Sequence, residues 1–143
     1  MWVESKIGLL HDRVFVDRDE YEVVRGRRGW RVIIDSHTPV GRVRYDSLRD
    51  RLSIESPSGP LEIRFRWRGT TFAWRGRTYR VGSMVWNRLS IFEGDRPVLE
   101  GKLIWSGVRL ETIAPEFREI ARELAVGLGL RAMAIATSFV PLG

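Results

Sequence analysis

Short apolar segments separated by turn signals run through the first 113 residues and constrain the fold more than any other feature. One of them, LEIRFRW, alternates strictly: Leu61, Ile63, Phe65 and Trp67 fall on one face of a strand, and Glu62, Arg64 and Arg66 on the other. Many short strands with one apolar and one polar face are typical of an antiparallel sheet closed around a core. The sequence predicts a mainly β protein, a closed antiparallel β-barrel of about a dozen short strands.

Three stretches have the shape of β-hairpins, with two apolar strands joined by a polar turn that contains Gly or Pro. They are WRVIIDSHTPVGRVRYD (residues 30–46), RLSIESPSGPLEIRF (51–65) and RLSIFEGDRPVLEGKL (88–103). Turns of this composition join neighbouring antiparallel strands. We therefore expect successive hairpins within one domain that covers residues 1–143, with strands in residues 1–113.

The last thirty residues predict a helix over about 115–137. Pro115 suits the first helical position, and Glu116 and Glu119 suit the first turn. From Leu124 onward the segment is apolar on every side except at Arg131, and it is shorter than the ~20 apolar residues that a membrane span needs. Gly127, Gly129 and several alanines make the helix thin, which favours a place inside the barrel. A helix clamped against one open sheet is the alternative.

The composition excludes several kinds of chemistry. The chain has no Cys, so disulfides, thiolate catalysis and Cys-based zinc sites are excluded. The only histidines are His11 and His37, and Asp35-Ser36-His37 cannot form a catalytic relay because consecutive strand residues point to opposite faces. We expect a turn before Pro39 there, and no catalytic residue, metal site or cofactor.

The start of the chain, MWVESKIGLL, does not resemble a signal peptide, so a cytoplasmic protein, peripheral at the membrane if it binds lipid, is expected. Glutamine is absent and Asn87 is the only asparagine. Few amides together with many charges fit a protein from a hot environment, while the arginine bias fits a GC-rich genome equally well.

The net charge of +6 comes from one stretch, RFRWRGTTFAWRGRTYR (residues 64–80), which contains six arginines and no acid. Everything outside it balances, with 18 basic and 18 acidic residues. Guanidinium groups bind phosphate oxygens in a bidentate manner, so a row of arginines on the outside of the barrel predicts an anion-binding strip. Its residues are Arg64, Arg66, Arg68, Arg75, Arg77 and Arg80. A bulge or tight turn near Gly76 is needed to place the last three beside the first three.

Two other interpretations of this stretch stay open. The arginines form a solvated face if acids on neighbouring strands pair with them. A nucleic-acid partner needs stacking aromatic residues on the basic face, and Phe65, Trp67, Phe72 and Trp74 are expected to face the core instead. The orientation of Tyr79 and Trp86 is left open, and Trp2, Trp30 and Trp105 are expected to pack in the core or in turns. A protein partner at an exposed apolar patch is the third class.

The order of these features resembles the tubby C-terminal-like superfamily, in particular its LURP-one-related and phospholipid-scramblase-like members. The resemblance rests on VIIDSHTPVGRV, LSIESPSGPLEI, FAWRGRTYRV, LSIFEGDRPVLEGKL and the closing apolar helix. It implies a barrel around one hydrophobic helix, and a non-enzymatic domain that binds membrane lipid headgroups or acts as a scaffold. The acidic calcium-binding segment of scramblases and a lysine-rich phosphoinositide pocket have no match here.

Overall fold

A computed structural model describes residues 1–8, 11–83 and 86–138. Its twelve strands form one antiparallel sheet in the order β7-β6-β5-β4-β3-β2-β1-β12-β11-β10-β9-β8. The strands are β1 (Val3–Lys6), β2 (Asp12–Val16), β3 (Asp19–Arg25), β4 (Trp30–Asp35), β5 (Thr38–Asp46), β6 (Arg51–Ser56), β7 (Gly59–Arg64), β8 (Thr70–Trp74), β9 (Arg77–Val81), β10 (Arg88–Glu93), β11 (Arg96–Ile104) and β12 (Gly107–Ile113). The three expected hairpins are β4–β5, β6–β7 and β10–β11, so that prediction is confirmed.

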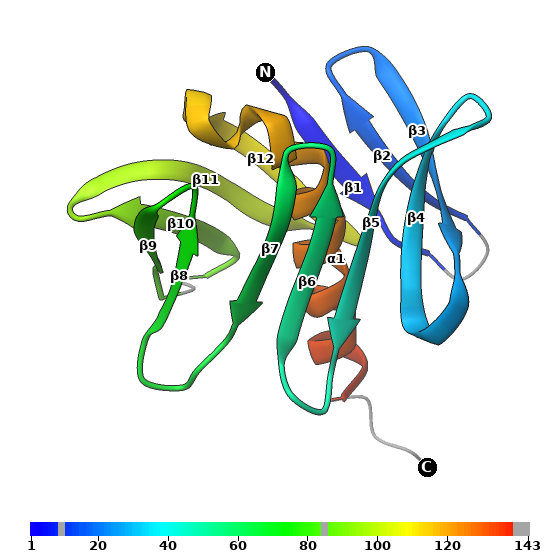
Figure 1. Ribbon diagram of the computed structural model, residues 1–143. Coiled ribbons are helices and arrows are strands. Elements are labelled where there is room, and N and C mark those ends of the chain that lie inside the picture. Colours follow the sequence, from blue (N-terminus) through cyan, green and yellow to red (C-terminus); the bar gives the residue numbers. More distant parts are fainter. Residues whose placement is uncertain (9–10, 84–85, 139–143) are drawn as a thin grey trace.

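The sheet curls into a nearly closed barrel, as predicted (Figure 1). Sequential strands pair with each other except β7 and β8, and β1 joins the two halves of the sheet by pairing with both β2 and β12. β7 and β8 are the two ends of this order, and they come close without a ladder between them. We call this line the seam.

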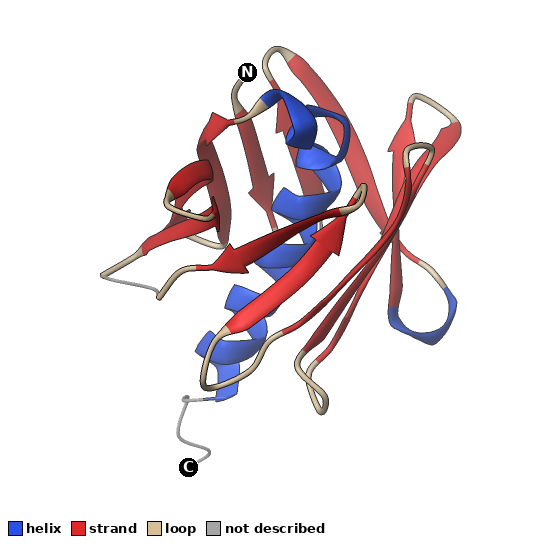
Figure 2. Ribbon diagram, turned by 60° about the vertical axis from the view of Figure 1, so that its left-hand side comes forward, coloured by secondary structure: helices blue, strands red, loops and turns tan. Residues whose placement is uncertain are grey.

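Helix α1 (Ala121–Ser138) packs along the inside of the sheet, mainly on β1, β2, β5, β6 and β12 (Figures 1 and 2). Its first half is buried at Leu124, Ala125 and Val126, whereas its second half is partly exposed. The glycines let the helix pack closely on the sheet. The Cα atoms of Gly127 and Gly129 face Leu52 and Ser5, and there is no room for a further carbon atom at either position. No helix in the described part of the chain is long and apolar enough to cross a membrane.

The segment before α1 differs in detail from the expected single helix. Residues Pro115–Ile120 form the 3₁₀ helix η2, and the α-helix begins only at Ala121. Phe117 of η2 is buried against Tyr79, with ring centroids 4.7 Å apart, and Trp74 donates its indole N–H to the carbonyl of Glu116 at 3.0 Å. Packing of η2 onto β8 and β9 therefore sets where α1 starts.

The barrel has two distinct ends because its strands alternate in direction. Turns that follow even-numbered strands lie with η2, and we call this the η2 end. Turns that follow odd-numbered strands lie at the other end, to which the C-terminal half of α1 points (Figure 1). Arg131 of α1 binds Asp50 of the β5–β6 turn there, at 2.9 and 3.1 Å, so we call this the α1 end.

A candidate anion-binding hollow at the barrel seam

A hollow of about 500 Å³ lies on the outside of the barrel, where β7 meets β8. Its lining comes from both sides of the seam: Glu62, Arg64, Arg66, Gly69 and Thr71. Glu62 and Arg64 point outward from β7 because Leu61 and Ile63 take the buried face of the same strand. Two guanidinium groups and a threonine hydroxyl are thus available around one concave surface, which is a donor set suited to phosphate oxygens.

Arginine is in excess of acid beside this hollow. Arg51 of β6 is the direct cross-strand partner of Arg64, and like charges in that position repel each other. The nearest acid is Glu62, whose Oε1 lies 3.8 Å from Arg64 Nε and 4.0 Å from Arg51 Nη1. Asp46 Oδ2 lies 4.0 Å from Arg51 Nη2. These contacts are longer than hydrogen bonds, so the guanidinium groups keep donors free for an incoming anion.

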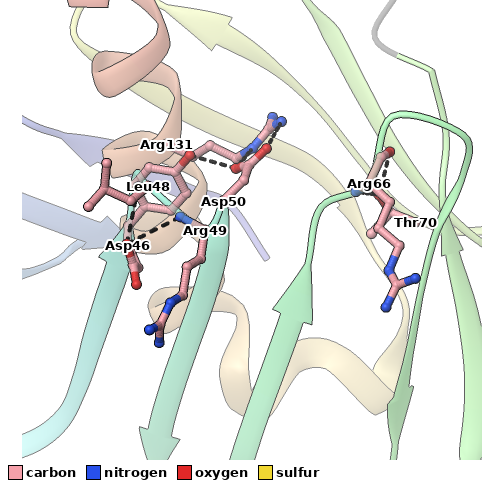
Figure 3. A network of polar contacts seen from close by, with 8 residues as sticks. Asp46, Leu48, Arg49, Asp50, Arg66, Thr70 and Arg131 are labelled. Carbon is pink, nitrogen blue, oxygen red and sulfur yellow. Dashed lines mark hydrogen bonds and ion pairs between the residues drawn. The ribbon is translucent and has the colours of Figure 1, made fainter.

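The loop after β7 holds two further arginines in a fixed turn. The Oγ1 of Thr70 accepts a hydrogen bond from Arg66 N at 2.8 Å and donates one to Arg66 O at 3.3 Å (Figure 3). The side chains of Arg66 and Arg68 are exposed. Neither forms an ion pair with a described residue, and the Arg68 guanidinium lies 5.8 Å from the Trp67 ring centroid.

Arg75 and Arg77 lie at the η2 end, away from the hollow, and acids already bind them. Arg75 donates to both carboxylate oxygens of Glu119 at 2.5 and 3.1 Å, and Arg77 binds Glu93 at 2.6 and 2.7 Å. Hydrogen bonds from Ser58 and then from Arg75 lower the pKa of Glu119. Those from Arg96 and Arg77 lower the pKa of Glu93. These two arginines therefore belong to ion pairs.

Arg80 is one strand farther from the seam. It pairs across the β8–β9 ladder with Thr71, but its guanidinium lies over the ring of Phe92 on β10, 4.7 Å from the centroid. All six arginines singled out in the sequence are exposed, and the expected tight turn is present at Arg75–Gly76. They do not form one strip. Arg64 and Arg66 line the hollow at the seam, Arg68 follows in the β7–β8 loop, Arg80 lies one strand farther away against Phe92, and Arg75 and Arg77 are paired at the η2 end.

The aromatic residues of the stretch divide between core and solvent. Phe72, Trp74 and Tyr79 are buried, which confirms the inward orientation expected of the first two. Trp67 was expected to face the core, and this is wrong, because β7 ends at Arg64 and Trp67 is 94% exposed in the following loop. Trp105 was expected to pack in the core or in a turn, and this is wrong, because it lies in the β11–β12 turn with 95% of its surface exposed.

Ser36 and His37 form the two-residue turn between β4 and β5, so the expectation of a turn before Pro39 is confirmed. Within the described residues, no group of three or more His, Asp or Glu side chains is arranged to hold a metal ion.

Arg51 is the member of the hollow's surroundings that sequence reasoning missed. The sequence does contain a signal for this pair. In a hairpin with a two-residue turn at Pro57–Ser58, two residues lie opposite each other when their numbers add up to the sum of 57 and 58. Residues 51 and 64 satisfy this rule, and the observed register agrees. Counting outward from the turn thus finds a clustered pair of arginines that a linear charge count does not show.

Comparison of the chain with protein-family models, with curated proteins and with solved structures found no match, so the resemblance to the tubby-like superfamily stays a prediction.

Proposed function

We propose that this protein is a non-enzymatic domain that binds anionic phosphate groups, with membrane phospholipid headgroups as the ligand. The observation that carries the proposal is the seam hollow, where Arg64 and Arg66 face Glu62 alone across a concave surface with the hydroxyl of Thr71. Guanidinium groups match phosphate oxygens in a bidentate manner, and the hydroxyl adds a neutral donor. Arg51 and Arg68 extend the positive charge on both sides.

A phospholipid surface fits this arrangement better than a single small phosphate compound. The arginines lie on the outside of the barrel and continue onto a loop of the α1 end, so a flat array of phosphates can contact the hollow and the loop together. Each basic residue close to an anionic bilayer contributes about 1 kcal/mol. The two hollow arginines together therefore account for about a thirtyfold change in affinity.

Vesicle co-sedimentation tests the proposal with two double variants that remove equal charge. Arg64→Ser/Arg66→Ser is expected to lower the affinity for phosphatidylserine-containing vesicles about thirtyfold. Arg75→Ser/Arg77→Ser is the matched control and is expected to have a clearly smaller effect, because acids already bind these arginines. Inorganic phosphate added as a competitor distinguishes a site for free phosphate from one that needs a lipid surface.

Binding that is equal for neutral and anionic vesicles would refute the proposal. So would an equal loss in the two double variants, because it would mean that only the total charge matters and not the hollow.

A nucleic-acid ligand is the second candidate, and one observation favours it. Trp67 is exposed between Arg66 and Arg68, an arrangement in which a base stacks on the indole while the arginines bind the backbone. Single-stranded oligonucleotide binding with a steep inverse dependence on salt, lost in Trp67→Ala, would support this ligand over lipid.

A further inference from the structure

The most exposed apolar side chains of the described chain all lie at the α1 end. They are Leu48, Trp67, Trp86 and Trp105, each 94% exposed or more. Four different loops carry them: the β5–β6 turn, the β7–β8 loop, the β9–β10 loop and the β11–β12 turn. These loops are consecutive around the barrel rim, because β5 to β7 and β8 to β12 are each consecutive in the sheet and β7 lies next to β8 across the seam.

The described loops hold these side chains out by specific contacts. Asp46 Oδ1 accepts hydrogen bonds from the backbone N–H groups of Leu48 and Arg49, at 3.1 and 3.3 Å, which fixes the turn below Leu48 (Figure 3). Thr70 braces the loop that carries Trp67 in the same way. Trp105 occupies a two-residue turn whose second residue, Ser106, has a φ of 61°.

The two ends of the barrel differ in charge. The α1-end loops contain Arg27, Arg28, Arg49, Arg66 and Arg68 against one acid, Asp50, which is itself bound to Arg131. The η2-end turns and η2 contain Asp17, Asp95, Glu116 and Glu119 against Arg18, Arg75 and Arg118. Five positive charges against one negative charge at one end, and three against four at the other, polarise the molecule along the barrel axis.

An apolar groove opens beside Trp105. It has a volume of about 370 Å³ and runs between the β11–β12 turn and the partly exposed half of α1. Its lining is Leu103, Ile104, Trp105, Ser106, Gly107, Ala132, Met133 and Ala136. The groove continues the apolar surface of the loop tips inward, toward the helix.

We propose that the α1 end inserts into the interface of an anionic bilayer. Leu48, Trp67, Trp86 and Trp105 enter the boundary between headgroups and acyl chains, where tryptophan is enriched, and the loop arginines contact the surrounding phosphates. The choice of anionic lipid rests on the proposed function, whereas the insertion of the loop tips rests on their own exposure. A bilayer fits these side chains better than a protein partner, because they project from four separate tips, two of which also carry arginines, and a flat interface can receive all of them together.

Fluorescence quenching by vesicles that contain acyl-brominated phosphatidylcholine and phosphatidylserine tests the insertion. The wild-type protein is expected to be quenched, and Trp67→Ser/Trp86→Ser/Trp105→Ser is expected to lose that quenching and to bind about tenfold more weakly at high salt. Trp2→Ser is the matched control, because Trp2 is partly exposed at the η2 end and should keep both signals. Thermal melts of each variant establish that the exposed substitutions leave the fold intact.

The outcomes separate the two proposals. Anionic-lipid binding that depends on Arg64 and Arg66 but shows no quenching would overturn the insertion and leave the proposed function standing. Quenching that is as strong in neutral vesicles as in anionic ones would support insertion and overturn the choice of anionic headgroups. A dimer in sedimentation velocity that the triple substitution converts to a monomer would overturn the bilayer in favour of a second copy of this chain.

Discussion

At the scale of single residues, Gly127 shows how closely the helix fits the barrel. A glycine inside a helix is ordinarily about 1 kcal/mol less favourable than alanine. At this position an alanine Cβ would lie 2.4 Å from Cδ1 of Leu52, which is fully buried on β6. We therefore expect Gly127→Ala to lower the free energy of unfolding by about 1–3 kcal/mol, the range for overpacked cores, in urea denaturation.

The same substitution has a built-in control. In a Leu52→Ala background the obstructing methyl groups are absent, so only the helix propensity of alanine remains. Gly127→Ala should then raise the free energy of unfolding by up to about 1 kcal/mol. If the substitution has the same sign in both backgrounds, contact with Leu52 is not the reason for this glycine.

Trp67 marks the limit of what alternation predicts for a single residue. The pattern in LEIRFRW assigns the faces of Leu61 and Ile63 correctly, and both are buried. It does not state where the strand ends, and β7 ends at Arg64, three residues before Trp67. The following loop is fixed by the hydrogen bonds between the Thr70 side chain and the Arg66 backbone. An alternating pattern of apolar and polar residues gives no information about such contacts. For this reason the core was predictable from the sequence and the exposed tip was not.

At the scale of elements, β1 lies outside the three hairpins that the sequence predicts, and its central residues are polar. Ser5 is fully buried, and its hydroxyl donates to Ala125 O at 2.6 Å and accepts from Val108 N at 3.2 Å. Glu4 is nearly buried and accepts a hydrogen bond from Arg109 at 2.8 Å. Buried polar groups are tolerated when they are hydrogen-bonded, but these partners lie more than a hundred residues away in the sequence. Local pattern alone therefore gives no signal for the strand that joins the two halves of the sheet.

The attachment of α1 to the β5–β6 turn should depend on pH through Asp50. Burial alone would raise the pKa of this carboxyl, but hydrogen bonds from Arg131 and Tyr45 outweigh it and lower the pKa below 3.8. A group with a lowered pKa in the folded state stabilises the fold above its ordinary pKa, and this contribution is lost as the pH falls through the lowered value. Asp50→Asn should thus destabilise the protein by about 1 kcal/mol at neutral pH, and the difference from wild type should shrink below pH 3.8 in thermal melts.

Tyr45 donates a hydrogen bond to Asp50 and should make the stability of the fold depend on pH at the alkaline end. Burial and then the hydrogen bond to Asp50 raise the pKa of its hydroxyl from 10.0 to about 12. A raised pKa means that the stabilisation is complete below pH 10 and is lost between pH 10 and about 12. Tyr45→Phe should remove this alkaline loss while leaving the ion pair of Asp50 with Arg131 in place. If Tyr45→Phe and the wild-type protein lose thermal stability equally above pH 10, this cluster is not the cause of the alkaline loss of stability.

At the scale of the whole molecule, the sheet order predicts uneven local stability. β1 and β12 lie near the middle of the order and pair on both sides, while β7 and β8 each lack a ladder at the seam. Strands without a partner on one side open more readily. Amide hydrogen exchange should therefore be slowest in β1 and β12 and faster in β7 and β8. Equal protection around the barrel would indicate that the seam is closed in solution.

The same experiment with anionic vesicles reports how the molecule is oriented. The excess positive charge lies at one end of the barrel, because the loop arginines are at the α1 end. The most exposed tryptophans lie at the same end. Binding through this end should slow exchange in residues 47–50, 65–69 and 105–106 and leave the turns at residues 75–76 and 94–95 unchanged. If exchange slowed in the turns of the η2 end instead, the membrane would contact the opposite end of the barrel. The exposed tryptophans would then not insert, and the proposed orientation would be wrong.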